Sequence, residues 1–268
     1  MKNAKFLALF LALTLLCYFV ASPQNMIMVN DRPIAELYSS DSKTEEVSVK
    51  KNYKRMVEPV VVIYTLSGSQ VQSSGTAFGI AYDKKADETY FLSNDHICSM
   101  PILGITFVGE KLNDSQASFR YDGKPDMQMT VVDKDPANDL CLLKADGSHP
   151  IVKIDKDTKL DVAEKLYIVG APNSNAPIIL ETFFSGYVPR SQLGSLGEGE
   201  QGALMVSEML QPGHSGSPIY NKRGELVGIS FASSVRDRVG QNSVMFSYGG
   251  LGIGMPDILI FLERNNIK

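Results

Sequence analysis

Ser215 lies in the most glycine-rich turn of the chain, within QPGHSGSPIYNKRGELVGI at residues 211–229. A serine hydroxyl is a weak nucleophile at neutral pH, so it needs a base within hydrogen-bonding reach and a third group that orients this base. The flanking Gly213 and Gly216 have two interpretations. They shape an ordinary turn, or they hold backbone amides where an oxyanion would form.

Three histidines are candidates for the base. His149 stands in a turn before a proline, which is typical of a surface loop. His214 is adjacent to Ser215, and neighbouring side chains in a tight turn generally point apart. His96 directly follows the apolar segment TYFLS, so we expect it where a strand ends and a loop opens. We therefore predict that His96 is the base.

Asp139 is the candidate for the group that orients the base. It immediately precedes the apolar segment LCLLK, and a carboxylate at the start of a buried strand is costly to desolvate without a donor partner. Taken alone, such a residue is more often a turn or cap residue. Together with His96 and Ser215 it gives the order His–Asp–Ser along the chain, which is that of a known type of catalytic site.

Short segments rich in β-branched and aromatic residues, bounded by Gly, Asp, Asn or Pro, fill most of the chain after residue 57. They form two series: 60–65, 75–82, 89–93, 104–108, 127–132 and 140–144, then 165–170, 178–188, 202–207, 217–221, 225–231, 243–249 and 251–255. Almost no helical periodicity separates them, which predicts an all-β fold of two lobes that divide near residues 145–158. Pro256 and the following DILIFLER predict a C-terminal helix.

The composition is that of a globular protein with a hydrophobic core, because 44% of the 268 residues are hydrophobic and 21% are charged. The net charge is −4 and no basic run is interleaved with aromatic residues, so nucleic acid is not expected as a partner. The sequence has no His-x-x-x-His motif and no ligand cluster at metal spacing. We expect neither a metal nor a cofactor.

Residues 1–22 combine two early lysines with an unbroken apolar run over residues 6–21, which is the pattern of a secretory signal peptide. The run is a little short for a membrane-spanning helix, which needs roughly 20 residues. Pro23 makes a poor cleavage junction, however, so an uncleaved membrane anchor stays open. We expect an exported protein, secreted or periplasmic, or one anchored by residues 6–21. Residues 23–56 predict a polar linker that leads into a short helix.

Cys98 and Cys141 each stand two residues after a candidate site residue, His96 and Asp139 respectively. If those two side chains meet, the segments that carry the cysteines run close together. An oxidising compartment favours a disulfide, which needs Cα atoms within about 7 Å. The alternative is a pair of buried thiols that pack as small hydrophobic groups.

Three stretches, SSGTAFGIAY…YFLSNDHI, DPANDLCLLK and QPGHSGSPIYNKRGELVGI, resemble the motif regions of trypsin-fold serine peptidases. The closest likeness is to the bacterial HtrA-type and glutamyl-endopeptidase-type branches, and it covers residues 57–265. It implies two six-stranded antiparallel β-barrels with the active site in the cleft between them. Residues 57–148 would form the first barrel, and residues 149–268 the second barrel with the C-terminal helix.

The resemblance also implies a role for each motif residue. Ser215 would be the nucleophile, His96 the general base and then the general acid, and Asp139 the group that orients His96. The backbone N–H groups of Gly213 and Ser215 would form the oxyanion hole, since Gly213 can adopt the required conformation. The partner would be a protein or peptide substrate, and the oligomeric state stays open.

The chain departs from the family pattern at several positions. His214 replaces the usual Asn or Asp before the nucleophile, and a histidine cannot pair as an anion with a newly cut N-terminus, so we do not expect zymogen activation of that type. Ser217 replaces a more common glycine, as in the glutamyl endopeptidases. No residues follow Lys268, so we expect the peptide-binding PDZ module of full HtrA proteins to be absent.

We expect the substrate pocket to include Met209, Ser230, Phe231 and Gly252. Met209 stands six residues before the nucleophile, where trypsin has an aspartate, and these segments offer no counter-charge for Lys or Arg. Ser230 stands where glutamyl endopeptidases have a histidine, which argues against acidic specificity. The sequence predicts an exported serine endopeptidase that cuts after small or medium apolar residues. The alternative is a catalytically idle trypsin-fold binding protein.

Overall fold

This computed structural model describes residues 28–29, 32–33, 52–67, 70–98, 102–106, 109–112, 116–119, 127–156, 159–172, 177–189, 202–239 and 244–267. The chain divides into two units, Met1–Lys50 and Lys51–Lys268. In the first unit, the described residues form the antiparallel pair of β1 (Met28–Val29) and β2 (Arg32–Pro33). The predicted signal or anchor segment, residues 1–22, and most of the predicted linker lie outside the described residues.

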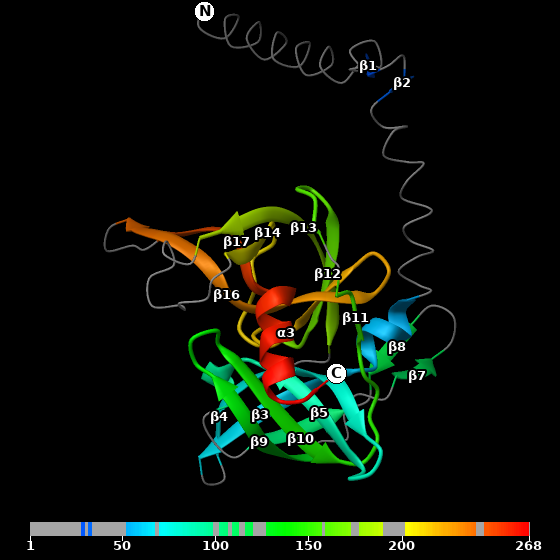
Figure 1. Cartoon of the computed structure of the whole chain (residues 1–268). Coiled ribbons are helices and arrows are strands. Elements are labelled where there is room, and N and C mark those ends of the chain that lie inside the picture. Colours follow the sequence, from blue (N-terminus) through cyan, green and yellow to red (C-terminus); the bar gives the residue numbers. More distant parts are fainter. Residues whose placement is uncertain are drawn as a thin grey trace, which may run out of the picture. The chain divides into compact units, whose positions relative to one another are not determined.

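Six antiparallel strands of the second unit close into a first barrel (Figure 1). Their order around the barrel is β10-β5-β4-β3-β6-β9. They are β3 (Val60–Ser67), β4 (Gln70–Asp83), β5 (Glu88–Ser93), β6 (Ile102–Thr106), β9 (Met127–Asp135) and β10 (Leu140–Asp146). A separate pair consists of β7 (Gly109–Leu112) and β8 (Gln116–Phe119).

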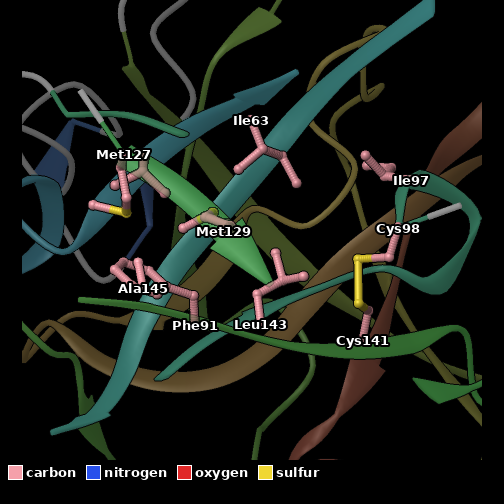
Figure 2. Close-up of a cluster of buried hydrophobic side chains, with 11 residues drawn as sticks. Ile63, Phe91, Ile97, Cys98, Met127, Met129, Cys141, Leu143 and Ala145 are labelled. Atoms are coloured by element: carbon pink, nitrogen blue, oxygen red, sulfur yellow. A yellow bond between two sulfur atoms is a disulfide. The ribbon is translucent and has the colours of Figure 1, made fainter. Parts of the chain in front are cut away.

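Alternating side chains fill the interior of the first barrel, because successive residues of a strand point to opposite faces. Met127 and Met129 of β9 are buried, whereas Gln128 between them is exposed. They pack in one cluster with Phe91 of β5 and Leu143 of β10 (Figure 2). Burying one such large apolar side chain contributes roughly 1.5–3 kcal/mol.

The second barrel is built from a sheet in the order β11-β16-β15-β12-β13-β14-β17. Its strands are β11 (Lys153–Ile154), β12 (Lys165–Gly170), β13 (Ile178–Val188), β14 (Ala203–Val206), β15 (Pro218–Asn221), β16 (Glu225–Val239) and β17 (Val244–Gly254). Because β16 also pairs with β17, six strands form a closed ring, and β11 adds to β16 in parallel. Leu166, Ile168, Phe184 and Ile219 lie in its core.

A C-terminal helix, α3 (Met255–Arg264), follows β17 directly (Figure 1). Pro256 lies in its first turn, where a missing N–H costs no helical hydrogen bond. Near its C-terminal end, Arg264 Nη2 lies 2.8 Å from Asp133 Oδ2 of β9. The helix therefore links the end of the second barrel to the first. None of the helices among the described residues is both long and apolar enough to cross a membrane.

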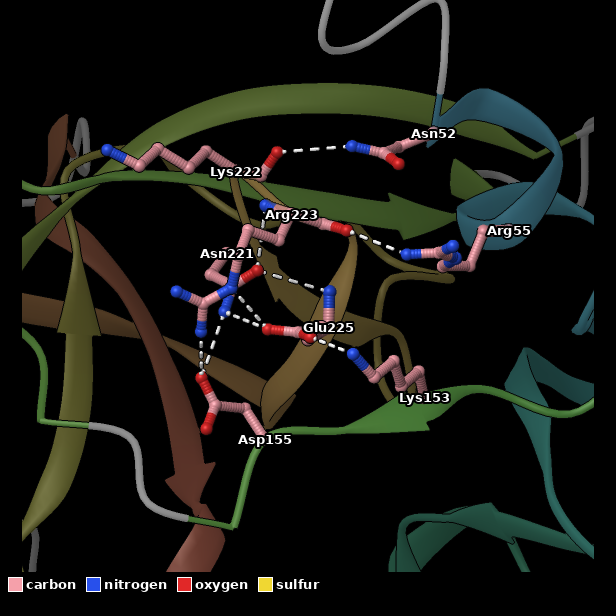
Figure 3. Close-up of polar contacts among 8 residues, drawn as sticks. All are labelled: Asn52, Arg55, Lys153, Asp155, Asn221, Lys222, Arg223 and Glu225. Carbon is pink, nitrogen blue, oxygen red and sulfur yellow. Dashed lines mark hydrogen bonds and ion pairs between the residues drawn. The ribbon is translucent and has the colours of Figure 1, made fainter.

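A polar network surrounds the turn between β15 and β16 (Figure 3). The Glu225 carboxylate accepts hydrogen bonds from Lys153 Nζ and from Arg223 Nε, and Asn221 Nδ2 donates to it at 3.3 Å. These donors hold the pKa of Glu225 at about 2, although burial alone would raise it. A carboxylate that is almost fully buried is thus kept charged and paired.

The same turn fastens a helical segment at residues 52–57 to the second barrel (Figure 3). Asn52 Nδ2 donates to the carbonyl of Lys222, and Arg55 Nη1 donates to the carbonyl of Arg223, each at 3.3 Å. Both acceptors are carbonyls of the turn between β15 and β16. The segment that enters the first barrel is therefore held by the second.

The structure confirms the predicted all-β fold of two six-stranded barrels with a C-terminal helix. It differs from the sequence-based prediction in the last strands. Residues 243–249 and 251–255 were expected as two strands, but β17 runs continuously from Val244 to Gly254. It pairs with β16, which extends to Val239 rather than ending near residue 231. Pairing between the two strands extends both of them.

Candidate active site

His96 and Asp139 meet at one edge of the first barrel. His96 lies on the short 3₁₀ helix η2 (Asp95–Ile97), directly after β5, and Asp139 directly precedes β10. His96 Nδ1 is 2.8 Å from Asp139 Oδ2 and 3.0 Å from Oδ1, and the His96 backbone N–H also donates to Oδ1 at 3.0 Å. The carboxylate therefore fixes both the ring and the backbone of His96.

Asp139 is held in an uncommon backbone conformation, with φ of 54°. Asp tolerates this left-handed region better than most residues. Asn94 Nδ2 donates to the carbonyl of Asp139 at 3.0 Å, which helps to hold this peptide in place. Because His96 Nδ1 faces the carboxylate, its Nε2 is the nitrogen left to exchange a proton with another group.

The turn that carries Ser215 belongs to the second barrel, between β14 and β15, but it is docked on β4 of the first. Thr76 donates twice: its N–H to the carbonyl of Ser215 at 2.9 Å, and its Oγ1 to the carbonyl of Gly213 at 2.8 Å. Gly216 has φ of 83°, and a Cβ there would lie 1.9 Å from the carbonyl oxygen of Thr76. The turn can approach β4 this closely only because Gly216 has no side chain.

These contacts leave two backbone donors without an acceptor. Within the described part of the chain, neither Gly213 N–H nor Ser215 N–H donates a hydrogen bond to a protein atom. Gly213 has φ of 99°, a conformation that glycine adopts at little cost. Two such amides beside a hydroxyl are the arrangement that stabilises an oxyanion.

The Ser215 hydroxyl donates to the carbonyl of Phe231 at 3.4 Å. Among the described residues, no hydrogen bond joins Ser215 to His96. Catalytic hydrogen bonds are often long or poorly aligned without substrate and tighten when it binds. The structure therefore brings His96 to Asp139 and holds Ser215 on the first barrel, with its hydroxyl directed to the Phe231 carbonyl of β16.

Of the four residues expected in the substrate pocket, Met209 is the exposed one, at 54%. Ser230 is fully buried, and its Oγ donates to the carbonyls of His214 at 2.5 Å and Ser217 at 3.2 Å. Phe231 is buried as a side chain, while Gly252 pairs with Ser230 across β16 and β17. Their roles toward substrate stay predictions, and the Ser230 hydroxyl is hydrogen-bonded beneath the turn that carries Ser215.

Cys98 and Cys141 form a disulfide, with their Cα atoms 6.4 Å apart (Figure 2). Of the two alternatives that the sequence left open, the structure contains the bridge. Cys98 ends η2 just after His96, and Cys141 lies in β10 just after Asp139. The bridge thus joins the two segments that carry the His96–Asp139 pair.

Sequence reasoning missed Thr76 and Asn94 as residues that support the site. Each acts on a backbone group far away in the chain, so neither forms a local motif. A glycine directly before Thr76, Gly75, is a signal of close packing at this point of the strand. A Cβ there would lie 2.2 Å from Ile97 Cδ1 and 3.1 Å from the Ser215 carbonyl oxygen. Among the residues that the structure describes, no group of three or more His, Cys, Asp or Glu side chains could hold a metal ion.

Sequence comparison identifies a family. The profile of the trypsin-like peptidase domain matches residues 75–229. A probable periplasmic serine endoprotease, DegP-like, of Pseudomonas putida (strain GB-1) is 27% identical over 209 residues, which cover 74% of this chain and 36% of that protein. The serine protease Do-like HtrB of Bacillus subtilis (strain 168) is 24% identical over 240 residues, which cover 79% of this chain and 48% of that protein. The chain therefore spans less than half the length of these relatives.

Solved structures share the fold. The serine endoprotease from Yersinia pestis superposes with a TM-score of 0.58 at 17% identity, covering 83% of this chain and 66% of that one. An HtrA-type protease, AlgW, with a tripeptide superposes with a TM-score of 0.59 at 20% identity, covering 84% of this chain and 64% of that one. At these identities the likeness concerns the two-barrel fold.

Proposed function

Because this chain belongs to the trypsin-like peptidase domain family, we propose that it is an exported serine endopeptidase that works through Ser215, His96 and Asp139. The observation that carries the proposal is the pair of short contacts from His96 Nδ1 to the Asp139 carboxylate, at 2.8 and 3.0 Å. That geometry orients an imidazole for proton transfer at Nε2.

In the proposed reaction, Ser215 Oγ attacks the carbonyl carbon of a peptide bond while His96 Nε2 takes the hydroxyl proton. Asp139 stabilises the imidazolium that forms, and the N–H groups of Gly213 and Ser215 bind the oxyanion. His96 then gives its proton to the leaving amine, which leaves an acyl-enzyme on Ser215. Water, activated by His96, hydrolyses the ester in the second half of the reaction.

We also propose a preference for small or medium apolar residues before the cleaved bond. Met209 is exposed beside the nucleophile turn and carries no charge. Ser230 stands at the position of the histidine in glutamyl endopeptidases, and its hydroxyl donates to the buried backbone carbonyls of His214 and Ser217. Export is supported by the apolar N-terminal run and by the periplasmic naming of the Pseudomonas putida relative.

Covalent labelling by a fluorophosphonate tests the proposal, because only an activated serine reacts. We expect the wild type to be labelled at Ser215 and the Ser215→Ala variant to be unlabelled. His96→Ala should lower the labelling rate by about 10³-fold or more, and peptide turnover should fall alike in the single variants and the double variant. His149→Ala removes a histidine outside the site and serves as the control.

The catalytically idle binding protein stays a second candidate, and one observation favours it. The Ser215 hydroxyl is directed to the Phe231 carbonyl, whereas an activated serine would bond to His96. Wild-type protein that folds but reacts with neither fluorophosphonate nor peptide would establish this alternative. Labelling that depends on His96 would eliminate it.

A further inference from the structure

His214 is a buried titratable group that the proposed reaction does not use. It stands between Gly213 and Ser215, whose N–H groups are the proposed oxyanion hole, and its side chain is only 2% exposed. Its backbone is tied on both sides: its N–H donates to the Gln211 carbonyl at 3.0 Å, and its carbonyl accepts from Ser217 N–H at 2.9 Å. The ring folds back under the turn that it belongs to.

The two ring nitrogens of His214 have different surroundings. Nδ1 lies 3.2 Å from both the N–H and the carbonyl oxygen of Gln211. Nε2 is buried and has no hydrogen-bond partner among the residues that the structure describes, and the same holds for the Oγ of the fully buried Ser217. Buried polar atoms without partners are rare in folded proteins, so each calls for an explanation.

These two orphan atoms lie on side chains that face the same point. A Cβ built at Gly170, the last residue of β12, would lie 2.0 Å from Ser217 Oγ and 3.1 Å from His214 Cδ2. Cδ2 is bonded to Nε2, so the imidazole edge and the hydroxyl both lie against Gly170, beneath the turn that carries Ser215. A buried water or a direct contact between them would satisfy both groups.

The described residues around His214 offer no counter-charge to a protonated ring. The groups that face it are backbone atoms of Gln211 in the turn, the hydroxyl of Ser217, the backbone of Gly170 on β12, and Ser230 on β16, which donates to the His214 carbonyl. Among the described residues, no Asp, Glu, Lys or Arg pairs with the ring. Burial accordingly lowers the pKa of His214 below its usual value, despite the Gln211 hydrogen bond.

We propose that neutral His214 is a positioning residue for the oxyanion hole, and that its protonation in acid switches the enzyme off. This inference rests on the proposed peptidase function. A buried imidazolium without a carboxylate is costly, and the Gln211 carbonyl, which can accept from Nδ1–H, does not offset that cost. The ring would therefore move out to water. Because it is part of the turn, Gly213 and Ser215 would move with it, and the two amides would no longer converge.

The test is the rate of fluorophosphonate labelling from about pH 4 to about pH 8, which needs no knowledge of the natural substrate. In the wild type, protonation of the general base alone lowers the rate about tenfold per pH unit. Protonation of His214 as well steepens the fall to about a hundredfold per unit. In His214→Asn, which keeps a hydrogen-bonding side chain that cannot titrate, we expect the steeper part to vanish. His149→Asn is the matched control and should keep it.

Ser217→Ala provides a second test that leaves His214 in place. Without the hydroxyl, Nε2–H of the protonated ring can no longer donate to Ser217, so the steep part should move to lower pH. The same change in the His214→Asn background should have no effect on the pH profile. The proposal is overturned if wild type and His214→Asn give superimposable profiles, or if the steep part persists without His214. Absence of any Ser215 labelling would instead overturn the proposed function.

Discussion

Reduction of the Cys98–Cys141 disulfide should lower the free energy of unfolding by about 4 kcal/mol. The bridge closes a loop of 43 residues, and cross-linking a loop of that length removes this much chain entropy from the unfolded state. The folded state should change little, because Cys141 is already paired with Ser93 where β10 and β5 run side by side. The effect therefore acts mainly through the unfolded chain.

Reduction of the disulfide should affect the rate of fluorophosphonate labelling less than it affects the free energy of unfolding. Cys98 ends η2, so breaking the bridge releases the C-terminal end of the helix that carries His96. The hydrogen bonds from His96 to Asp139 remain. We expect the rate of fluorophosphonate labelling to fall by about tenfold or less, since a small loss of orientation costs far less than loss of the base.

Urea unfolding with and without a thiol reductant measures this prediction, because reduced wild type keeps both sulfur atoms and loses only the cross-link. The Cys98→Ala/Cys141→Ala variant is the control, and its midpoint should not depend on the reductant. The reasoning would be refuted if the free energies of unfolding of oxidised and reduced wild type differed by less than about 1 kcal/mol. An equal response of the control to reductant would also refute it.

Three further changes test other parts of the structure. Glu225→Gln should cost about 1–2 kcal/mol at neutral pH, since it removes the charged acceptor of the hydrogen bonds from Lys153 and Arg223, whose own side chains are largely exposed. Because the folded pKa of Glu225, about 2, lies below the ordinary 4.5, the difference in melting temperature between variant and wild type should narrow as the pH falls below 4.5. The pKa of His214 is lowered in the folded protein, so the unfolded chain binds its proton more readily. The free energy of unfolding should therefore fall as the pH drops below 6.5, and His214→Asn should make this fall less steep when urea unfolding is measured at several pH values. Gly216→Ala should cost about 3 kcal/mol or more and abolish labelling, because its Cβ meets the Thr76 carbonyl. Gly186→Ala, also at positive φ but in open space, should cost only the backbone strain, and equal losses in the two variants would contradict the collision.

The strands that could be predicted from sequence are those with local signals. Residues 165–170 and 178–188 match β12 and β13 at both ends, because their apolar segments are bounded by turn residues. The short strand β11, at Lys153–Ile154, has no such signal, since two residues carry no periodicity. The end of β16 at Val239 was also missed. Its polar residues form a strand because β17 supplies hydrogen-bonding partners, which is a property of the pair.

The candidate site divides in the same way. Residue type and chain order selected His96 and Asp139, and the structure places them in contact. The choice between a disulfide and two thiols depended on the distance between two segments 43 residues apart, which sequence alone leaves open. The contribution of Thr76 was invisible because its acceptor, the Gly213 carbonyl, lies 137 residues away. A side chain that hydrogen-bonds to backbone far away in the chain leaves no local pattern in the sequence.

The two hydrogen bonds from Thr76 to the turn that carries Ser215 have a consequence for exchanging parts of this protein. By sequence, Ser215 belongs to the second barrel, but two of its turn carbonyls are held by a strand of the first. A chimera with a foreign first barrel would therefore keep the serine and lose its position, unless the graft carried a threonine and a preceding glycine at the matching place. Two halves produced as separate chains would each be inert, and reactivity toward fluorophosphonate would return only on mixing, which makes it a reporter of barrel docking.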